Sequence, residues 1–217
     1  MFPFKSIRSK LLFFCLSLSL IPIAVITAVY CVKGYTSLRE LQVGELSLIA
    51  ESNKTHLYTA LNAKKGRTID FSSDGFIRDT LEKINEDNRN RDRLIKSLNQ
   101  HLTKYKRPLD PYISDIAVLN TNGVVVASTN QRWIDQSYAG TPFFTKGMKA
   151  SYGNATVHQP LFCLFSKQNS IYITAPLTSR RSASAEKLGI IINCYDLAIL
   201  HDVMKTDVQM GATGEVY

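Results

Sequence analysis

The side chains most often used in catalysis and metal binding are dispersed along this chain. Its histidines are His56, His101, His158 and His201, and no two of them have the spacing of a metal-binding pair. The sequence contains no glycine-flanked nucleophile and no glycine-rich phosphate loop. Acidic residues are common enough to lie near one another by chance, so they identify no hydrolytic pair. We therefore expect no catalytic residues, no metal and no cofactor, and keep an anchored exterior hydrolase only as a third hypothesis.

The four cysteines fall into two pairs. Cys15 and Cys31 lie in an apolar N-terminal stretch, whereas Cys163 and Cys194 lie in the remainder of the chain. The second pair has neither the spacing of a disulfide scaffold nor the partner histidines of a zinc site. We expect buried free thiols, with a Cys163–Cys194 disulfide as the alternative in an oxidising compartment.

The apolar stretch runs from Leu11 to Val32 without a charge. Its length of about 22 residues spans roughly 33 Å as a helix, enough to cross a bilayer. Lys5, Arg8 and Lys10 precede it, so the positive-inside rule places the N-terminus in the cytoplasm and the rest outside. A cleaved signal peptide is the alternative, but its apolar core would be shorter, about 7–15 residues. We expect a single-pass anchor in the inner (plasma) membrane, with an extracytoplasmic or periplasmic domain.

The positive net charge invites a nucleic-acid partner, but the other features of the sequence argue against one. The formal net charge is +8, of which three positive charges lie in the first ten residues, and acids are interleaved with the remaining bases. No basic-aromatic module of the RNA-recognition kind is present, and an exterior domain meets no nucleic acid.

Helical periodicity continues beyond the apolar stretch. Leucines and isoleucines recur at roughly helical spacing from Leu38 to Leu61, which predicts one long stalk helix that ends near Gly66. Such a stripe packs against neighbouring helices or forms a homodimer seam. A second helix is expected after Asp70, with Ser72 or Ser73 as its N-cap. Apolar residues resume between positions 94 and 102, which completes a helical hairpin.

Beyond Pro111 the apolar period changes to two. We expect strands at 113–119, 124–129, 156–165, 170–177 and 187–194, with a turn at Asn120–Gly123 because Asn-Gly supplies left-handed conformations. Short helices are expected at 141–149, where Pro142 lies in the first turn, and at 196–205.

The order of several segments resembles the Cache family, the PAS-like extracytoplasmic sensors of bacterial kinases, chemoreceptors and cyclic-di-nucleotide enzymes. The segments are AVLNTNGVVVASTNQ (117–131), TPFF (141–144), IYITAPL (171–177) and LGIIINCYDLAIL (188–200), with DFSSDGFIRD (70–79) and KYKRPLDP (104–111) similar to double-Cache sensors. The resemblance implies an α+β fold whose stalk helix and helical hairpin precede a PAS-like five-stranded antiparallel sheet.

The resemblance also predicts a domain organisation. We expect a cytoplasmic lead (1–10), a transmembrane helix (11–33), a helical stalk and second helical segment (34–110), a sensor subdomain (111–206), and the start of a truncated membrane-proximal subdomain (207–217). A return helix and an output module, such as a histidine kinase or a diguanylate cyclase, would then be missing.

In the family, the sheet and the short helix enclose a small-molecule pocket. The corresponding candidates here are four aromatic residues that could stack on a ligand and three polar contributors from strands: Trp133, Tyr138, Phe143, Phe144, Tyr172, Thr174 and His158. Core packing is the alternative for the aromatic residues, and a surface or internally bonded histidine is the alternative for His158.

Departures from the family pattern limit the classes of ligand that the site would bind. Thr141 stands where the family often has an arginine that holds a carboxylate. Leu161 and Cys163 align with a tyrosine and an aspartate of amino-acid-binding members, so an amino-acid ligand is disfavoured. A carboxylate ligand would need a substitute cation from Arg132, Lys146 or Lys149. Asp196 matches a family aspartate, but its place before a helix favours a capping role.

Two hypotheses for the function of the chain are favoured. The first is a membrane-anchored extracytoplasmic small-molecule sensor, the input part of a transmembrane signalling protein that forms a homodimer through its stalk. The second is a non-sensing dimerisation or protein-interaction domain whose pocket is filled by its own aromatic side chains. A sizeable cavity beside Trp133 and Tyr138 would favour the first.

Overall fold

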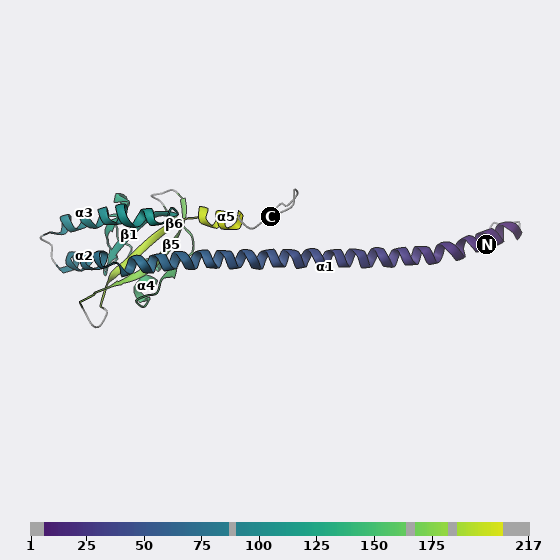
Figure 1. The fold of residues 1–217 in the computed structure, drawn as a ribbon, viewed down its shortest axis with the longest axis horizontal. Helices are drawn as coiled ribbons and strands as arrows, with labels where there is room; N and C mark the ends of the chain where they lie inside the picture. Colours follow the sequence, from purple (N-terminus) through teal and green to yellow (C-terminus); the bar gives the residue numbers. More distant parts are fainter. Residues whose placement is uncertain (1–6, 87–89, 164–167, 182–185, 206–217) are drawn as a thin grey trace. The chain divides into compact units, whose positions relative to one another are not determined.

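The computed structural model describes residues 7–86, 90–163, 168–181 and 186–205 (Figure 1). The chain divides into two units, residues 1–52 and 53–217, which are considered separately.

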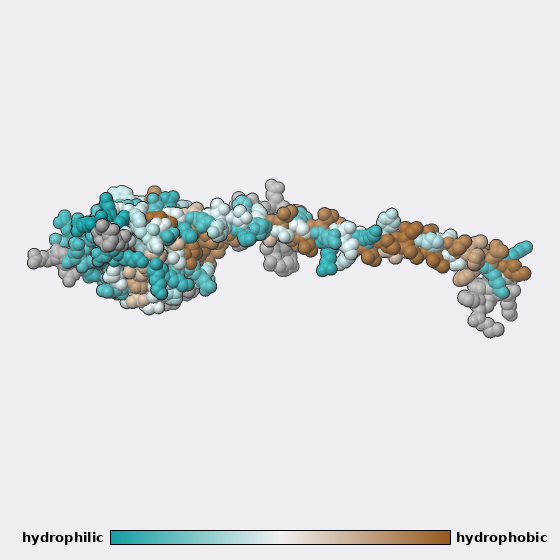
Figure 2. Space-filling model, turned by 90° about the horizontal axis from the view of Figure 1, so that it is seen from below, coloured by the Kyte–Doolittle hydropathy of each residue, from teal (hydrophilic) through white to brown (hydrophobic). Residues whose placement is uncertain are grey.

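The first unit consists of the N-terminal part of α1 (Ile7–Ser73). Its side chains are exposed and largely apolar, and Figure 2 shows them gathered over the N-terminal stretch of the helix. Among the described residues α1 is the one helix long and apolar enough to cross a membrane, judged by length and composition. Pro22 lies inside it, as lipid-buried helices tolerate.

The predicted end of this helix at Gly66 is wrong, because α1 continues to Ser73. An isolated glycine inside a helix costs only about 1 kcal/mol relative to alanine. The next turns bury Thr68 and Phe71 completely against the second unit's core, and that burial outweighs the glycine penalty.

A one-residue break in the helix at Asp74 separates α1 from α2 (Gly75–Glu86). The Asp74 carboxylate accepts the Ile77 N–H at 3.1 Å, so Asp74 performs the capping role predicted for Ser72 or Ser73. The hydroxyls of both serines instead donate to carbonyls of α1. Burial pushes the pKa of Asp74 up, but the Lys106 ammonium and the Ile77 N–H outweigh it, and the net pKa is lowered.

The second helical segment forms the predicted hairpin. α3 (Arg91–His101) lies beside α2 and continues into the π-helix η1 (Leu102–Lys106) and the 3₁₀ turn η2 (Arg107–Leu109) (Figure 1). The proline of that last turn prevents further α-helix, and the chain becomes extended at Ile113.

The remaining elements build one antiparallel sheet. Its strands are β1 (Ile113–Asn120), β2 (Val125–Ser128), β3 (Thr156–Val157), β4 (Leu161–Cys163), β5 (Gln168–Thr178) and β6 (Lys187–Asp196). Their order is β2-β1-β6-β5-β3, and β4 also pairs with β5. The predicted strand at 156–165 is therefore interrupted, and β3 and β4 share one position beside β5. The predicted five-stranded arrangement is otherwise confirmed.

The predicted Asn120–Gly123 turn joins β1 to β2. Asn120 Oδ1 accepts the N–H groups of Asn122 and Val124 at 3.1 and 3.0 Å. Gly123 has φ +76°, a conformation that glycine adopts without strain.

The sheet carries a different hydrophobic core on each face. Strand β6 alternates, with Ile191 and Tyr195 on the face covered by α1, α2 and α3, and Ile190, Ile192 and Cys194 on the face covered by α4 (Pro142–Lys149). Cys194 is buried, as predicted. The Cys163 side chain lies outside the described part of the chain.

A last helix, α5 (Ala198–Lys205), follows β6. Asp196 Oδ1 accepts the Ala198 N–H at 2.9 Å, which confirms its predicted capping role.

Candidate functional site

The candidate site lies between α4 and the strands β5 and β6. Phe143 and Phe144 in the first turn of α4 are 6% and 7% exposed and point into the core of this face. Gly147 lets the helix approach the sheet closely, because a Cβ there would lie 2.9 Å from Thr174 Oγ1. Gly147 therefore determines how closely α4 packs against the sheet at this site.

Four rings form what we call the aromatic cluster: Trp133, Tyr138, Phe143 and Tyr172. Phe143 stacks on Tyr172 with centroids 5.7 Å apart and an interplanar angle of 11°. The Trp133 ring lies 5.8 Å from Tyr138 and 6.2 Å from Tyr172. These separations are typical of favourable aromatic contacts. Trp133 and Tyr172 are buried, whereas Tyr138 is half-buried at the rim.

The loop that follows β2 carries two of these rings, Trp133 and Tyr138, and hydrogen bonds fix its conformation. The Asn130 side chain accepts the Arg132 N–H and starts the 3₁₀ turn η3 (Gln131–Trp133). The loop then runs back along β2, where Tyr138 N–H donates to the Gly123 carbonyl at 2.8 Å. A side chain at Gly123 would collide with Ala139, at 2.6 Å from its Cα. The Asn120–Gly123 turn and the loop after β2 therefore fix each other's position. Backbone hydrogen bonds of Trp133 and Tyr138 determine where their rings lie.

A neutral polar pair lies next to the rings. His158 Nε2 is 2.8 Å from Thr174 Oγ1, and the His158 backbone N–H donates to the Tyr172 carbonyl at 2.9 Å. Burial and, in second place, the positive charge of Lys146 lower the pKa of His158 to about 4. The imidazole is therefore neutral at pH 7, and His158 and Thr174 can form hydrogen bonds to a ligand as uncharged groups.

The structure thus brings together all seven residues named from the sequence on one face of the sheet. Phe144 belongs to the same buried cluster as the rings, and His158 is buried and internally bonded. Thr141, which stands in place of the family arginine, donates its hydroxyl to the Tyr138 carbonyl at 2.7 Å. The three candidate cations Arg132, Lys146 and Lys149 have exposed side chains. The side chains of Leu161 and Cys163 lie outside the described residues.

Sequence reasoning missed one ionisable group on this face, Asp115 in β1. It is 8% exposed, and burial raises its pKa more than Asn130, Arg107 and Thr129 lower it. An acid inside the mostly apolar strand ISDIAVLN was the available signal.

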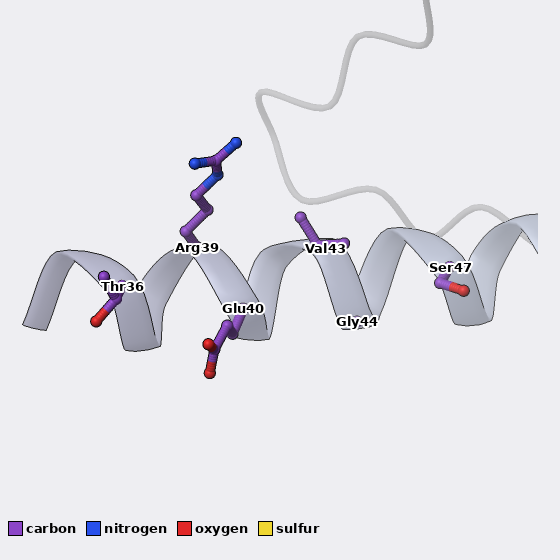
Figure 3. A pocket seen from close by; sticks show the side chains of 6 residues that line it. All are labelled: Thr36, Arg39, Glu40, Val43, Gly44 and Ser47. Atoms are coloured by element: carbon purple, nitrogen blue, oxygen red, sulfur yellow. The ribbon is translucent and has the colours of Figure 1, made fainter. Parts of the chain in front are cut away.

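A hollow lies on α1, but it is no enclosed site. Figure 3 shows its lining side chains, which all come from this one helix: Thr36, Arg39, Glu40, Val43, Gly44 and Ser47. Arg39 and Glu40 point away from each other in that view. Residues three or four apart on a single helix form an open surface, so this feature does not surround a ligand. Among the described residues no group of three or more metal-ligating side chains is present.

Comparisons with known proteins identify the fold. No protein-family model matches the sequence, and no characterised protein matches it by sequence either. The structure is similar to the sensor domain of the V. cholerae histidine kinase DctB, with a TM-score of 0.62 and 17% identity, over 77% of this chain and 61% of that one. This chain has the Cache fold. The resemblance given by its segments is thereby confirmed for the architecture.

Two other solved Cache-type domains are less similar. The E. coli DcuS sensor domain has a TM-score of 0.47 at 12% identity, over 71% of this chain and 98% of that one. The ligand-binding domain of the P. fluorescens chemoreceptor CtaA, solved with L-alanine, has a TM-score of 0.49 at 14% identity, over 74% of this chain and 62% of that one. The chain spans about three fifths of the DctB and CtaA domains.

Proposed function

We propose that this chain is the small-molecule-binding input part of a membrane-anchored signalling protein, with its sheet domain outside the cytoplasm. The observation that carries the proposal is the convergence of the aromatic cluster and the His158–Thr174 pair on one sheet face beneath α4. Rings placed beside a few neutral polar groups are typical of small-molecule sites. The apolar stretch of α1 supports the anchor, and the basic residues before it support an exterior domain.

A route from this site to α1 is present in β6. Cys194 faces the site, whereas its neighbours Asn193 and Tyr195 face α1. Asn193 Nδ2 donates to Thr68 Oγ1 at 3.1 Å, and the Tyr195 hydroxyl donates to the Lys64 carbonyl at 3.3 Å. Burial raises the pKa of Tyr195 to about 12, so its hydroxyl stays protonated as a donor. A ligand that alters the pleat of β6 would therefore act on α1 through these contacts, by its differential affinity for two conformations.

The stalk supports a homodimer as part of the same proposal. Leu38, Leu41 and Leu48 on α1 are 62–74% exposed. A second copy of the helix would cover such a stripe. Light scattering of the full chain in micelles tests this: we expect a dimer that Leu41→Glu dissociates, and a monomeric wild-type protein would contradict it.

The alternative is a protein-interaction domain with a filled site. The stacking of Phe143 on Tyr172 favours it, because those two rings already occupy each other's faces.

One experiment separates the two functions. Trp133 is the only tryptophan of the sequence, so the tryptophan fluorescence of the full chain in micelles, excited selectively over that of the tyrosines, reports on this site alone. Small carboxylates, amines, purines and sugars are screened by fluorescence and by melting temperature, which binding to the native state raises. For a sensor, a hit should be lost in Tyr138→Ala and kept in Tyr58→Ala, an exposed tyrosine of α1. Hits that both variants retain would favour the interaction domain.

A further inference from the structure

Asp115 lies in line with the aromatic cluster. In the register of the sheet, Asp115 of β1 pairs with Cys194 of β6, and Cys194 pairs with Tyr172 of β5. Directly opposite residues of paired strands project from the same face, with Cβ atoms about 5 Å apart. The carboxylate therefore faces the same side as the rings, one strand beyond Cys194.

The buried carboxylate of Asp115 is poorly compensated by the protein. It accepts hydrogen bonds from Thr129 Oγ1 at 3.4 Å and from Asn130 Nδ2 at 3.5 Å, both at the outer limit of such bonds. Within the described residues it forms no ion pair. A buried charge without a close partner is costly, and proteins retain such groups mainly where function uses them.

The neighbouring groups suit a cation. The faces of aromatic rings attract ammonium groups, and tryptophan does so most strongly. His158 lies beyond β5, at the far side of the rings from Asp115, and its imidazole is neutral at pH 7, so it adds no positive charge to this face. The exposed Lys146 is the cation that acts on His158, and Arg107 is the cation that acts on Asp115, but neither forms an ion pair with Asp115. Among the described residues no cation forms an ion pair with Asp115, and a positively charged ligand would supply one.

We propose that the ligand of this site carries an ammonium group, bound by the Asp115 carboxylate, and an apolar or aromatic body that lies against Trp133 and Tyr138. This inference rests on the proposed sensor function and names its ligand class. It replaces the expectation from Leu161 and Cys163 that an ammonium group would find no acid here, because the acid comes from β1.

The test compares ligands of one shape and different charge. The full chain in micelles is titrated with phenethylammonium, 2-phenylethanol and phenylacetate, and Trp133 fluorescence is recorded. We expect phenethylammonium to bind at least about tenfold more tightly than the other two, since hydrogen bonds to charged groups have that magnitude. Asp115→Asn should abolish the preference. Asp92→Asn, which removes an exposed acid of α3, should preserve it.

The outcomes are distinct for the two proposals. Binding of 2-phenylethanol or phenylacetate at least as tight as that of phenethylammonium would overturn the cation inference and leave the sensor proposal standing. Equal losses in both variants, or no response to phenethylammonium, would also overturn it. The unliganded Asp115→Asn protein supplies a second measurement. We expect its melting temperature to equal or exceed that of the wild type, because an uncompensated charge is removed; a clear decrease would assign Asp115 a structural role instead.

Discussion

The pair Lys64–Asp110 offers the sharpest test of how α1 is fastened to the sheet domain. Lys64 Nζ lies 2.6 Å from Asp110 Oδ2, with the two side chains 16% and 5% exposed. The ammonium group also lies over the rings of Tyr112 and Tyr195, 4.9 and 5.7 Å from their centroids. Asp110 accepts one further hydrogen bond, from the Tyr112 N–H at 3.1 Å. Lys64→Met keeps the length of the stem and leaves this carboxylate buried beside a single neutral donor.

Removing one partner of a buried pair costs about 3–5 kcal/mol. Lys64 retains some exposure and Asp110 retains the Tyr112 N–H, so we expect the lower end, about 3 kcal/mol of unfolding free energy. In a protein of this size that lowers the melting temperature by roughly 6–12 °C. Removing both charges, in Lys64→Met with Asp110→Asn, should restore part of the loss because no charge is then left unpaired.

Urea unfolding in micelles, followed by Trp133 fluorescence, measures these free energies. Lys96→Met on the exposed face of α3 is the matched control and should cost less than about 0.5 kcal/mol. A Lys64→Met loss no larger than that of the control would refute the reasoning. A double variant less stable than Lys64→Met would show that the charges are not coupled.

Two further predictions concern pH and backbone strain. The pKa of His158 is lowered to about 4 in the folded chain, below its unfolded value of 6.5, so the unfolded state binds the extra proton and stability falls as pH decreases from about 6.5 towards 4. We expect a loss of up to about 3 kcal/mol in urea titrations across this range, and a flatter profile in His158→Gln. Gly123 and Gly153 both have positive φ, but only Gly123 has a close neighbour, Ala139. Gly123→Ala should therefore destabilise the protein by at least about 2 kcal/mol and Gly153→Ala by about 1 kcal/mol, and equal losses in thermal unfolding would contradict a steric role for Ala139.

Local chemistry made much of the fold predictable from the sequence. Asn120 and Gly123 define a turn whatever surrounds them, and the alternation of β5 places Tyr172 and Thr174 on one face by its period of two. That alternation, with the placement of Trp133 after β2, is why the candidate site residues assemble as a group. The split of the predicted strand at 156–165 was missed because it depends on how Pro160 interrupts pairing with β5.

Features set by distant contacts could not be predicted. The end of α1 at Ser73 follows from the burial of Phe71 against residues far along the chain, and periodicity within the helix does not contain that information. The same holds for Asp115, whose importance depends on its register with Cys194 and Tyr172. An acid in a strand is usually solvated, and only the sheet pairing shows that this one faces the rings.

The two borders of the sheet have a consequence for assembly. Strand β2 is flanked by its own following loop, since Val125 exchanges backbone hydrogen bonds with Asp135 and Gln136. At the other border β3 has two residues, and Pro160, which lacks an N–H, separates it from β4. Within the described residues, neither border presents a long, unpaired row of N–H and carbonyl groups on which a strand of another molecule could be added. Copies of this domain should therefore associate without extending the sheet, and the chain should resist the edge-to-edge aggregation to which open sheets are prone.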